Sequence, residues 1–214
     1  MQPMNKALLM VVLVWTMTAQ DRPSLFFRED WKETPPATPV TKEHVVNADL
    51  QLMLHGPGRD GIKKSHHDRP ADDPYYIWSG TCNGNWAVSL HHRDSDVDLS
   101  GLAKIRWRSK QAGFRQLRII LKLADGTWIV SEQSDGPSLD WREIEFNISD
   151  LRWRRLDIKT IIEGAPVGKP DLRRVEEVGF TDLMTGGGSI ACSRLDWIAV
   201  YGRSVRRHAA PTGP

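Results

Sequence analysis

Residues 117–131 read LRIILKLADGTWIVS and predict an antiparallel β-hairpin. Two runs rich in β-branched residues, Leu117–Leu123 and Thr127–Ser131, flank Asp125-Gly126, a dipeptide that favours tight turns because it tolerates positive φ angles. Since side chains alternate along a strand, a two-residue turn gives the hairpin one apolar face. The side chains expected on that face are Leu117, Ile119, Leu121, Leu123, Trp128 and Val130. Arg118, Lys122 and Ser131 are expected outside.

The same pattern extends over most of the chain. Asn83-Gly84 predicts a second hairpin between Tyr75–Cys82 and Asn85–His92, with Trp78 opposite Ser89 and Tyr76 opposite His91. Helix is limited to a turn or two, at Asp157–Ile162 or Pro170–Glu177. Further strands are expected at Leu25–Phe27, Ala103–Lys110, Arg142–Ile148, Val175–Thr181 and Arg194–Tyr201. Many short strands with Gly-rich turns predict an all-β fold, an antiparallel β-sandwich or jelly roll with little helix.

The N-terminus has the pattern of a signal peptide. Lys6 precedes the apolar run Ala7–Trp15, and small residues follow it, with cleavage expected near Ala19 or Gln20. The run is too short to span a bilayer, which takes about 20 residues. We therefore expect a signal peptide at 1–20, a single β-sandwich domain at 21–203 and a disordered tail at 204–214. The expected location is secreted or periplasmic.

Charge and cysteine content narrow the partners. The chain has 29 basic and 27 acidic side chains, and Lys6 leaves with the signal peptide. This near-neutral balance gives no general attraction to nucleic acid or membrane, and we expect a monomer. Cys82 and Cys192 are predicted to form a disulfide in an oxidising compartment, with two buried free thiols as the alternative.

The hairpin registers predict an aromatic and basic outer face. Next to that face, the segment Lys63–Trp78, KKSHHDRPADDPYYIW, reads as a polar loop rather than a core strand. The apolar CH face of a sugar ring stacks on indole or phenol rings, and Asp, His and Arg meet its hydroxyls. The predicted saccharide-binding residues are His66, His67, Asp72, Asp73, Tyr76, Trp78, His91, Arg106, Arg108 and Arg118. The alternative for Trp78 is a position in the core. The arginine and lysine residues of this face have two alternatives: they form the solvated side of a sheet, or they bind a carboxylate or sulfate.

Metal binding and catalysis have weaker patterns. We expect no cofactor and no metal centre, although His67, His91 and Asp72 would form a cross-loop metal site, and Asp94–Asp98 would suit a structural calcium ion. No GxSxG, HExxH or phosphate-loop motif occurs. Paired carboxylates among Asp72, Asp73, Asp182, Glu143 and Glu145 would serve glycoside hydrolysis. Tyr76 or His67 beside an arginine would serve a polysaccharide lyase. An exported structural or interaction domain is the third alternative.

Several short motifs carry a family resemblance. VDLSG at 97–101, KIRWRSK at 104–110, EEVGF at 176–180 and SRLDWIAVYG at 193–202 resemble the galactose-binding-like jelly-roll domain of secreted carbohydrate-binding modules. The resemblance covers residues 95–202 and implies a jelly roll that binds a polysaccharide or oligosaccharide. LFFREDW at 25–31 is similar to the first strand of concanavalin-like sandwiches, including secreted keto-disaccharide hydrolases, but no catalytic motif of that family aligns here.

Overall fold

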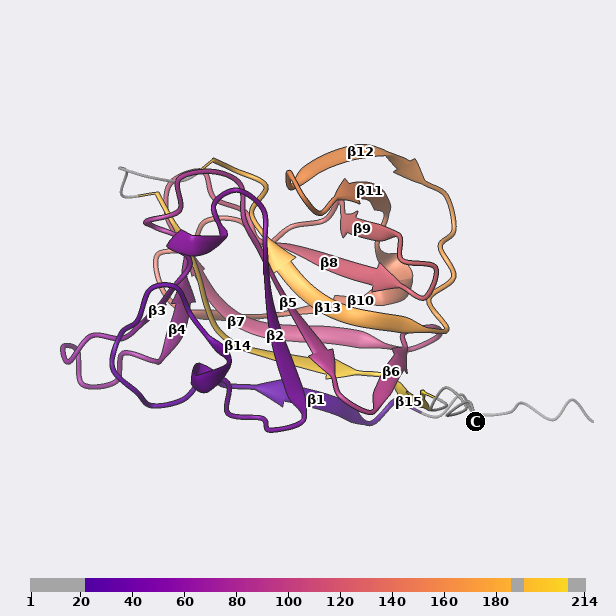
Figure 1. Cartoon of the computed structure of the whole chain (residues 1–214), viewed down its shortest axis with the longest axis horizontal. Helices are drawn as coiled ribbons and strands as arrows, with labels where there is room; N and C mark the ends of the chain where they lie inside the picture. Colours follow the sequence, from indigo (N-terminus) through magenta and orange to yellow (C-terminus); the bar gives the residue numbers. More distant parts are fainter. Residues whose placement is uncertain (1–21, 186–190, 208–214) are drawn as a thin grey trace, which may run out of the picture.

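The computed structural model describes residues 22–185 and 191–207, and it is a sandwich of two antiparallel sheets (Figure 1). Sheet A has the order β10-β7-β14-β4-β3, with β1 also paired to β14. Its strands are β1 (Leu25–Glu29), β3 (Lys63–Ser65), β4 (Tyr76–Trp78), β7 (Lys104–Gln111), β10 (Arg142–Asn147) and β14 (Ser193–Tyr201).

Sheet B has the order β12-β11-β9-β8-β13-β5-β2, with β6 paired to β13 and β15. Its strands are β2 (Leu50–His55), β5 (Ala87–His92), β6 (Ser95–Asp98), β8 (Arg118–Leu123), β9 (Trp128–Ser131), β11 (Trp153–Asp157), β12 (Ile162–Val167), β13 (Val175–Thr181) and β15 (Arg203–Arg206). Helical turns in the described residues are three short 3-10 segments, at Lys42–His44, Arg59–Gly61 and Ile148–Asp150. The predicted all-β sandwich is confirmed. The turns expected at 157–162 and 170–177 are not helical.

The core lies between the sheets and follows from alternation along the strands. In β7, every second residue from Ile105 is buried while its neighbours are partly exposed. Trp107 packs edge to face on Phe146, with ring centroids 5.0 Å apart. Its Nε1 donates to Asp135 Oδ2 at 3.0 Å. The buried Asp135 also pairs with Arg142, so its charge is compensated.

The β8–β9 hairpin forms, but its predicted register is off by one. Gly126 N–H donates to Leu123 O, and Leu123 N–H donates to Thr127 O, which makes a three-residue loop with Gly126 at φ +81°. Lys122 therefore pairs with Trp128. A one-residue slip moves side chains to the other face of the sheet, so Ile129 enters the main core while Trp128 faces outward.

The hairpin predicted at Asn83-Gly84 is wrong. β4 pairs with β3 and β14 in sheet A, whereas β5 pairs with β2 and β13 in sheet B. Asn83-Gly84 lies in the crossover between the sheets, where Gly84 has φ +135°. The dipeptide indicated a positive φ correctly, but a positive φ does not require that the flanking strands pair.

The domain boundaries and the cysteines also differ in part. Residues 203–206 form β15, and Arg207 is held by Asp96 and by the His92 carbonyl, so the ordered chain continues past residue 203. The predicted signal peptide and residues 208–214 lie outside the described residues. Cys82 and Cys192 are buried free thiols and not a disulfide, and burial raises the pKa of Cys82 to about 12.

Candidate functional site

The segment predicted as a polar loop is itself a hairpin. Lys63–Ser65 pairs with Tyr76–Trp78, and residues 66–75 form its tip. At the base of the tip, His67 Nδ1 lies 2.9 Å from Asp73 Oδ2 and 3.0 Å from the Tyr76 hydroxyl. The His67 backbone N–H also donates to Asp73 at 2.8 Å. These contacts fix an imidazole and a carboxylate beside the outer face of sheet A.

Aromatic and guanidinium groups gather on that outer face. Tyr76 packs against Trp141, with centroids 5.2 Å apart, and the Arg108 guanidinium lies 5.6 Å from the centroid of the same indole. Arg108 also forms a 2.8 Å ion pair with Asp196. Burial raises the pKa of Asp196 to about 6, although the charge of Arg108 opposes that shift. Trp141 is half-buried, so part of its ring faces solvent.

Four side chains lie in one row across neighbouring strands of sheet A, and the row includes Trp78, two positions after Tyr76 on β4. Trp78 pairs in register with Lys63 on one side and Arg194 on the other, and Arg194 pairs with Lys110. We call Lys63, Trp78, Arg194 and Lys110 the cationic row. Arg194 and Lys110 also line an open hollow of about 630 Å³, whose other wall is the segment Pro137–Leu139.

Trp78 is half-buried rather than sealed in the core. A Cβ built at Gly80 would lie 2.0 Å from Trp78 Cζ2, so the indole rests directly against a residue with no side chain. The ammonium of Lys63 lies 5.4 Å from the indole centroid. Trp78 is therefore held at the surface, and its register neighbour Arg194 lines the hollow.

The structure divides the predicted binding residues between two faces. His67, Asp73, Tyr76, Trp78, Arg106 and Arg108 come together on or beside the outer face of sheet A. His66 stacks on Tyr75 at 4.0 Å, and Asp72 is exposed at the hairpin tip.

His91 and Arg118 lie on sheet B, so the prediction of a single face is wrong for them. For His91 the cause is the incorrect pairing at Asn83-Gly84, which had put β4 and β5 side by side. For Arg118 the cause is that β7 and β8, which were expected to share a face, belong to different sheets. The prediction also missed Trp141, Arg194, Lys110 and Lys63. For Lys110 and Arg194, alternation with the core residues Trp107 and Leu195 was the available signal.

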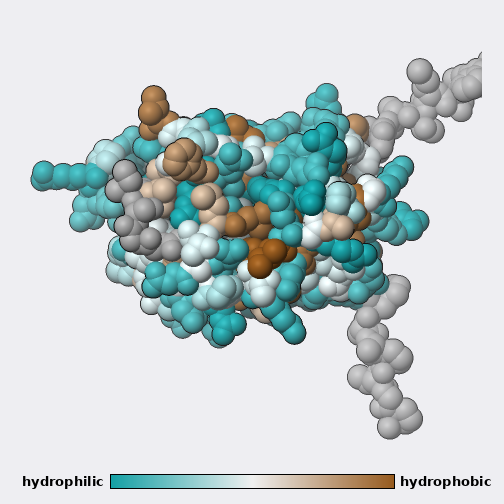
Figure 2. Space-filling model, turned by 90° about the horizontal axis from the view of Figure 1, so that it is seen from above, coloured by the Kyte–Doolittle hydropathy of each residue, from teal (hydrophilic) through white to brown (hydrophobic). Residues whose placement is uncertain are grey.

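The outer face of sheet B is covered in part by its own chain. The turn between β11 and β12 folds over it and buries Ile161, which packs with Trp128, Val130 and Ile120. Asn85 Nδ2 donates to the Ile161 carbonyl at 2.9 Å and ties the turn down. From the side of this hairpin, apolar groups form small patches within a hydrophilic surface (Figure 2).

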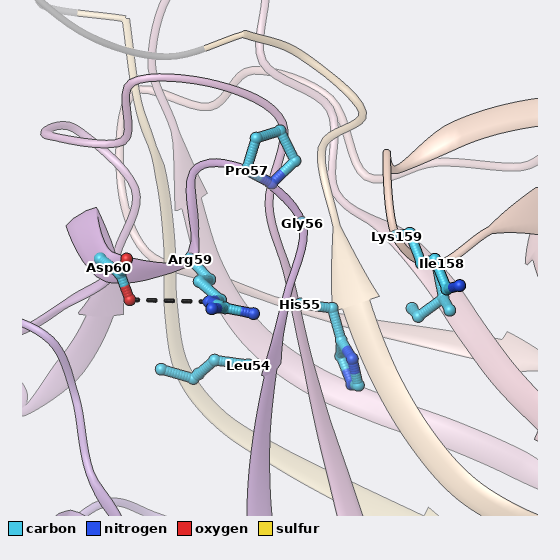
Figure 3. A pocket seen from close by; sticks show the side chains of 8 residues that line it. All are labelled: Leu54, His55, Gly56, Pro57, Arg59, Asp60, Ile158 and Lys159. Carbon is cyan, nitrogen blue, oxygen red and sulfur yellow. Dashed lines mark ion pairs between the residues drawn. The ribbon is translucent and has the colours of Figure 1, made fainter.

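Beside that covered area lies a polar network and a smaller hollow. His55 Nε2 lies 2.8 Å from Ser89 Oγ, which donates to Glu177 Oε2 at 2.6 Å, and Lys122 pairs with Glu177 at 3.2 Å. Burial lowers the pKa of His55, so the imidazole is neutral at pH 7. His55 lines a hollow of about 410 Å³ between the end of β2 and the β11–β12 turn (Figure 3).

The two metal sites considered from the sequence do not form. Asp96 pairs with Arg174 at 2.6 Å, and Asp98 pairs with Arg203 at 2.7 Å, so the carboxylates expected to hold calcium face cations. The cross-loop metal site fails because His91 is on the other sheet. Within residues 22–185 and 191–207, no three His, Cys, Asp or Glu side chains are arranged to hold a metal ion.

Comparison with known proteins gives structural likeness only. No family model and no curated protein matches the chain. A family 11 carbohydrate-binding module of a cellulosomal cellulase of Clostridium thermocellum is 18% identical, with 80% of this chain and 97% of that chain covered and a TM-score of 0.48. A family 29 carbohydrate-binding module complexed with mannohexaose is 13% identical, with coverages of 85% and 92% and a TM-score of 0.43. These modules belong to the group of structures that residues 95–202 were predicted to resemble. Separately, no helix in the described part of the chain is long and apolar enough to cross a membrane.

Proposed function

We propose that this protein is an exported carbohydrate-binding β-sandwich whose ligand lies on the outer face of sheet A. The observation that carries the proposal is the placement of two half-buried indoles, Trp78 and Trp141, on one face, with Tyr76 next to Trp141. His67, Asp73 and Arg108 supply polar groups around them. Export is the expectation from residues 1–20.

The chemistry of this face suits a sugar. A half-buried indole offers an apolar surface without the entropy cost of ordering a flexible side chain, and the apolar face of a pyranose ring covers it. Tyr76 is itself buried, with 2% of its surface exposed, and it packs against the indole of Trp141. Because Trp78 lies two residues from Tyr76 on the same strand, roughly 7 Å away, neighbouring groups of one extended ligand would reach the indoles of Trp78 and Trp141. We base the proposal on this geometry and not on the structural likenesses, whose TM-scores lie below 0.5.

The test is isothermal titration against a panel of polysaccharides, with the variant Trp78→Ala. Loss of a buried aromatic anchor costs roughly 1–3 kcal/mol of binding free energy, while the melting temperature should change little because the ring is only half-buried. Tyr201→Ala is the matched control, since Tyr201 is a half-buried aromatic residue on the same strand as Arg194, at its far end. Absence of binding to every glycan, or equal loss in both variants, contradicts the proposal.

A second candidate function, a glycan-active enzyme, is favoured by the hollow on sheet B. Because the Ser89 hydroxyl donates to Glu177, His55 Nε2 must carry the proton that Ser89 accepts, and Nδ1 is left as a base. A neutral imidazole oriented in this way, beside the hollow, has the form of a general base. Release of reducing ends, or of an unsaturated product absorbing in the ultraviolet, that is lost in His55→Gln would support this function. Absence of any product from the panel would exclude it.

A further inference from the structure

We infer that the ligand of sheet A is an acidic saccharide, one that carries carboxylate or sulfate groups and is recognised by the cationic row. This inference rests on the proposed function and names its ligand class. It follows from three features of the row: unpaired charge, spacing, and the indole between the cations.

The charges of the row are largely uncompensated. In the described residues, Lys63 contacts the Trp78 indole and Arg194 contacts the Tyr76 side chain, and neither forms an ion pair with a carboxylate. Lys110 has one carboxylate near it, that of Asp140 at 3.9 Å, and the Asp140 side chain is 88% exposed. Such a loose surface pair is worth little and is easily exchanged for a ligand anion.

The other cations on the central strand β7 do not share this property. In the neighbouring charge ladder, Lys104 pairs with Glu145 at 2.8 Å and Arg106 with Glu143 at 2.8 Å. Arg108 is paired with Asp196 at 2.8 Å. The solvated face of a sheet normally balances its charges in this manner. The row is the part of the face where positive charge is left for a ligand.

The spacing of the row suits an extended ligand. Neighbouring strands lie about 4.8 Å apart, so the row spans roughly 14 Å from Lys63 on β3 to Lys110 on β7. The Arg194 side chain hydrogen-bonds to the Tyr76 side chain, which orients the guanidinium. Its remaining N–H groups can donate to a carboxylate or sulfate in a planar geometry that lysine lacks. The hollow lined by Arg194 and Lys110 gives a bulky anionic group room at one end of the row.

The indole of Trp78 makes this surface different from a site that binds any polyanion. Its register neighbours are Lys63 and Arg194, one on each side. A sugar ring seated on the indole would present its equatorial substituents to both cations. A flexible polyanion without rings would gain only the charge contacts.

The experiment is titration calorimetry at low ionic strength with four probes: polygalacturonate, a sulfated galactan, a neutral galactomannan and polyglutamate. We expect the two acidic glycans to bind at least tenfold more tightly than the galactomannan and polyglutamate. Their relative affinities distinguish carboxylate from sulfate recognition. Raising the salt concentration from 20 to 500 mM should weaken acidic-glycan binding several-fold, because it screens charges that lie partly in solvent.

The test variant is the triple change Lys63→Met, Arg194→Met and Lys110→Met. Each lost contact is expected to lower affinity for the preferred acidic glycan roughly two- to fivefold, and the three together roughly eightfold or more. The matched control replaces Lys42, Lys169 and Arg206, which lie outside sheet A, with Met, and it should leave affinity unchanged. Methionine keeps the aliphatic stem, and circular dichroism checks that both variants fold.

The possible outcomes separate the two proposals. Equal or tighter binding of the neutral galactomannan, or affinity unchanged in the triple variant, overturns the acidic ligand class while the glycan-binding function stands. If polyglutamate binds as tightly as polygalacturonate, the cationic row attracts polyanions without recognising a sugar, and the inference is also overturned. Absence of binding to all three glycans overturns the proposed function itself.

Discussion

The two outer faces of this sandwich are built from similar residues but use them differently. On sheet B, the cations of the central strand β8 are paired: Arg118 with Glu163 at 2.9 Å, and Lys122 with Glu176 and Glu177 at 3.0 and 3.2 Å. Arg155 on β11 and Arg206 on β15 are exposed and form no ion pair within the described residues. On sheet A, the cationic row has only the loose contact between Lys110 and Asp140.

Aromatic residues show the same difference. Trp128 on sheet B is 9% exposed because the β11–β12 turn packs on it through Ile161. Trp78 and Trp141 on sheet A are half-buried and have no such cover. A group whose partners are supplied by its own chain stabilises the fold, whereas a group left partly unpartnered is available to a ligand. Under the proposed function, sheet A binds the ligand, and the outer face of sheet B serves mainly to stabilise the fold.

The strongest way to break this comparison is Trp128→Ala. Loss of a large buried aromatic side chain costs about 3–5 kcal/mol of unfolding free energy, and we expect a loss of this size in urea denaturation. Glycan affinity of the folded variant should be unchanged, because Trp128 lies on the opposite sheet from the cationic row. If the variant loses glycan affinity but keeps its stability, the glycan binds on sheet B and the comparison is wrong.

Glu177→Gln tests the polar network of sheet B. The Glu177 side chain is 8% exposed, accepts from Ser89 and pairs with Lys122, so the amide leaves part of the network unsatisfied. We expect a loss of about 1–3 kcal/mol of unfolding free energy, measured by chemical denaturation, and no change in glycan binding. A variant as stable as the parent would show that the network is not what stabilises this face.

Trp141→Ala sharpens the comparison on sheet A. The indole contacts Tyr76 and Arg108 but lies only half-buried at the surface. Binding should weaken by roughly 1–2 kcal/mol, measured by calorimetry, and the melting temperature should move far less than in Trp128→Ala. The reverse ranking of the two melting temperatures would contradict the division between the faces.

The smallest expected effect is a pH dependence from Asp196. The Asp196 carboxyl has a pKa of about 6, raised by burial, and it faces Arg108 from β7 together with Asp30 and Arg28 near β1. Protonation as pH falls from 7.5 to 5 removes the partner of Arg108, so acidic-glycan affinity should rise about two- to threefold. Asp196→Asn should bind equally at both pH values. If the affinity of Asp196→Asn still rises as pH falls, the pH effect belongs to another group.

The raised pKa of Asp196 also determines how the free energy of unfolding changes with pH. The folded pKa of about 6 lies above the ordinary value of 3.8, so the folded protein binds more protons than the unfolded chain between these values. The contribution of Asp196 to stability therefore grows as pH falls from about 6 to 4. Comparing denaturation of the parent and Asp196→Asn at pH 7 and pH 4.5 measures that contribution.

Local pattern was sufficient for most strand positions. The strands predicted at Ala103–Lys110 and Val175–Thr181 match β7 and β13 to within one residue. In β7 the signal is alternation, because a half-buried strand needs an apolar residue at every second position. Six strands were missed: β2, β3, β6, β11, β12 and β15. Of these, β3 consists of polar residues only, and β12 is exposed over most of its length. An edge strand has little apolar burial to leave a pattern in the sequence.

The amino-acid sequence by itself determined the all-β class, most strands and the residue types of a binding face, since these depend on side-chain period and turn preference. Only the tertiary structure decided which strands are neighbours, and therefore which cations lie beside Trp78. Asn83-Gly84 and Asp125-Gly126 look alike locally, yet one joins two sheets and the other closes a hairpin one residue longer than expected. Pairing is a long-range choice made by the burial of whole sheets, and a dipeptide contains no information about it.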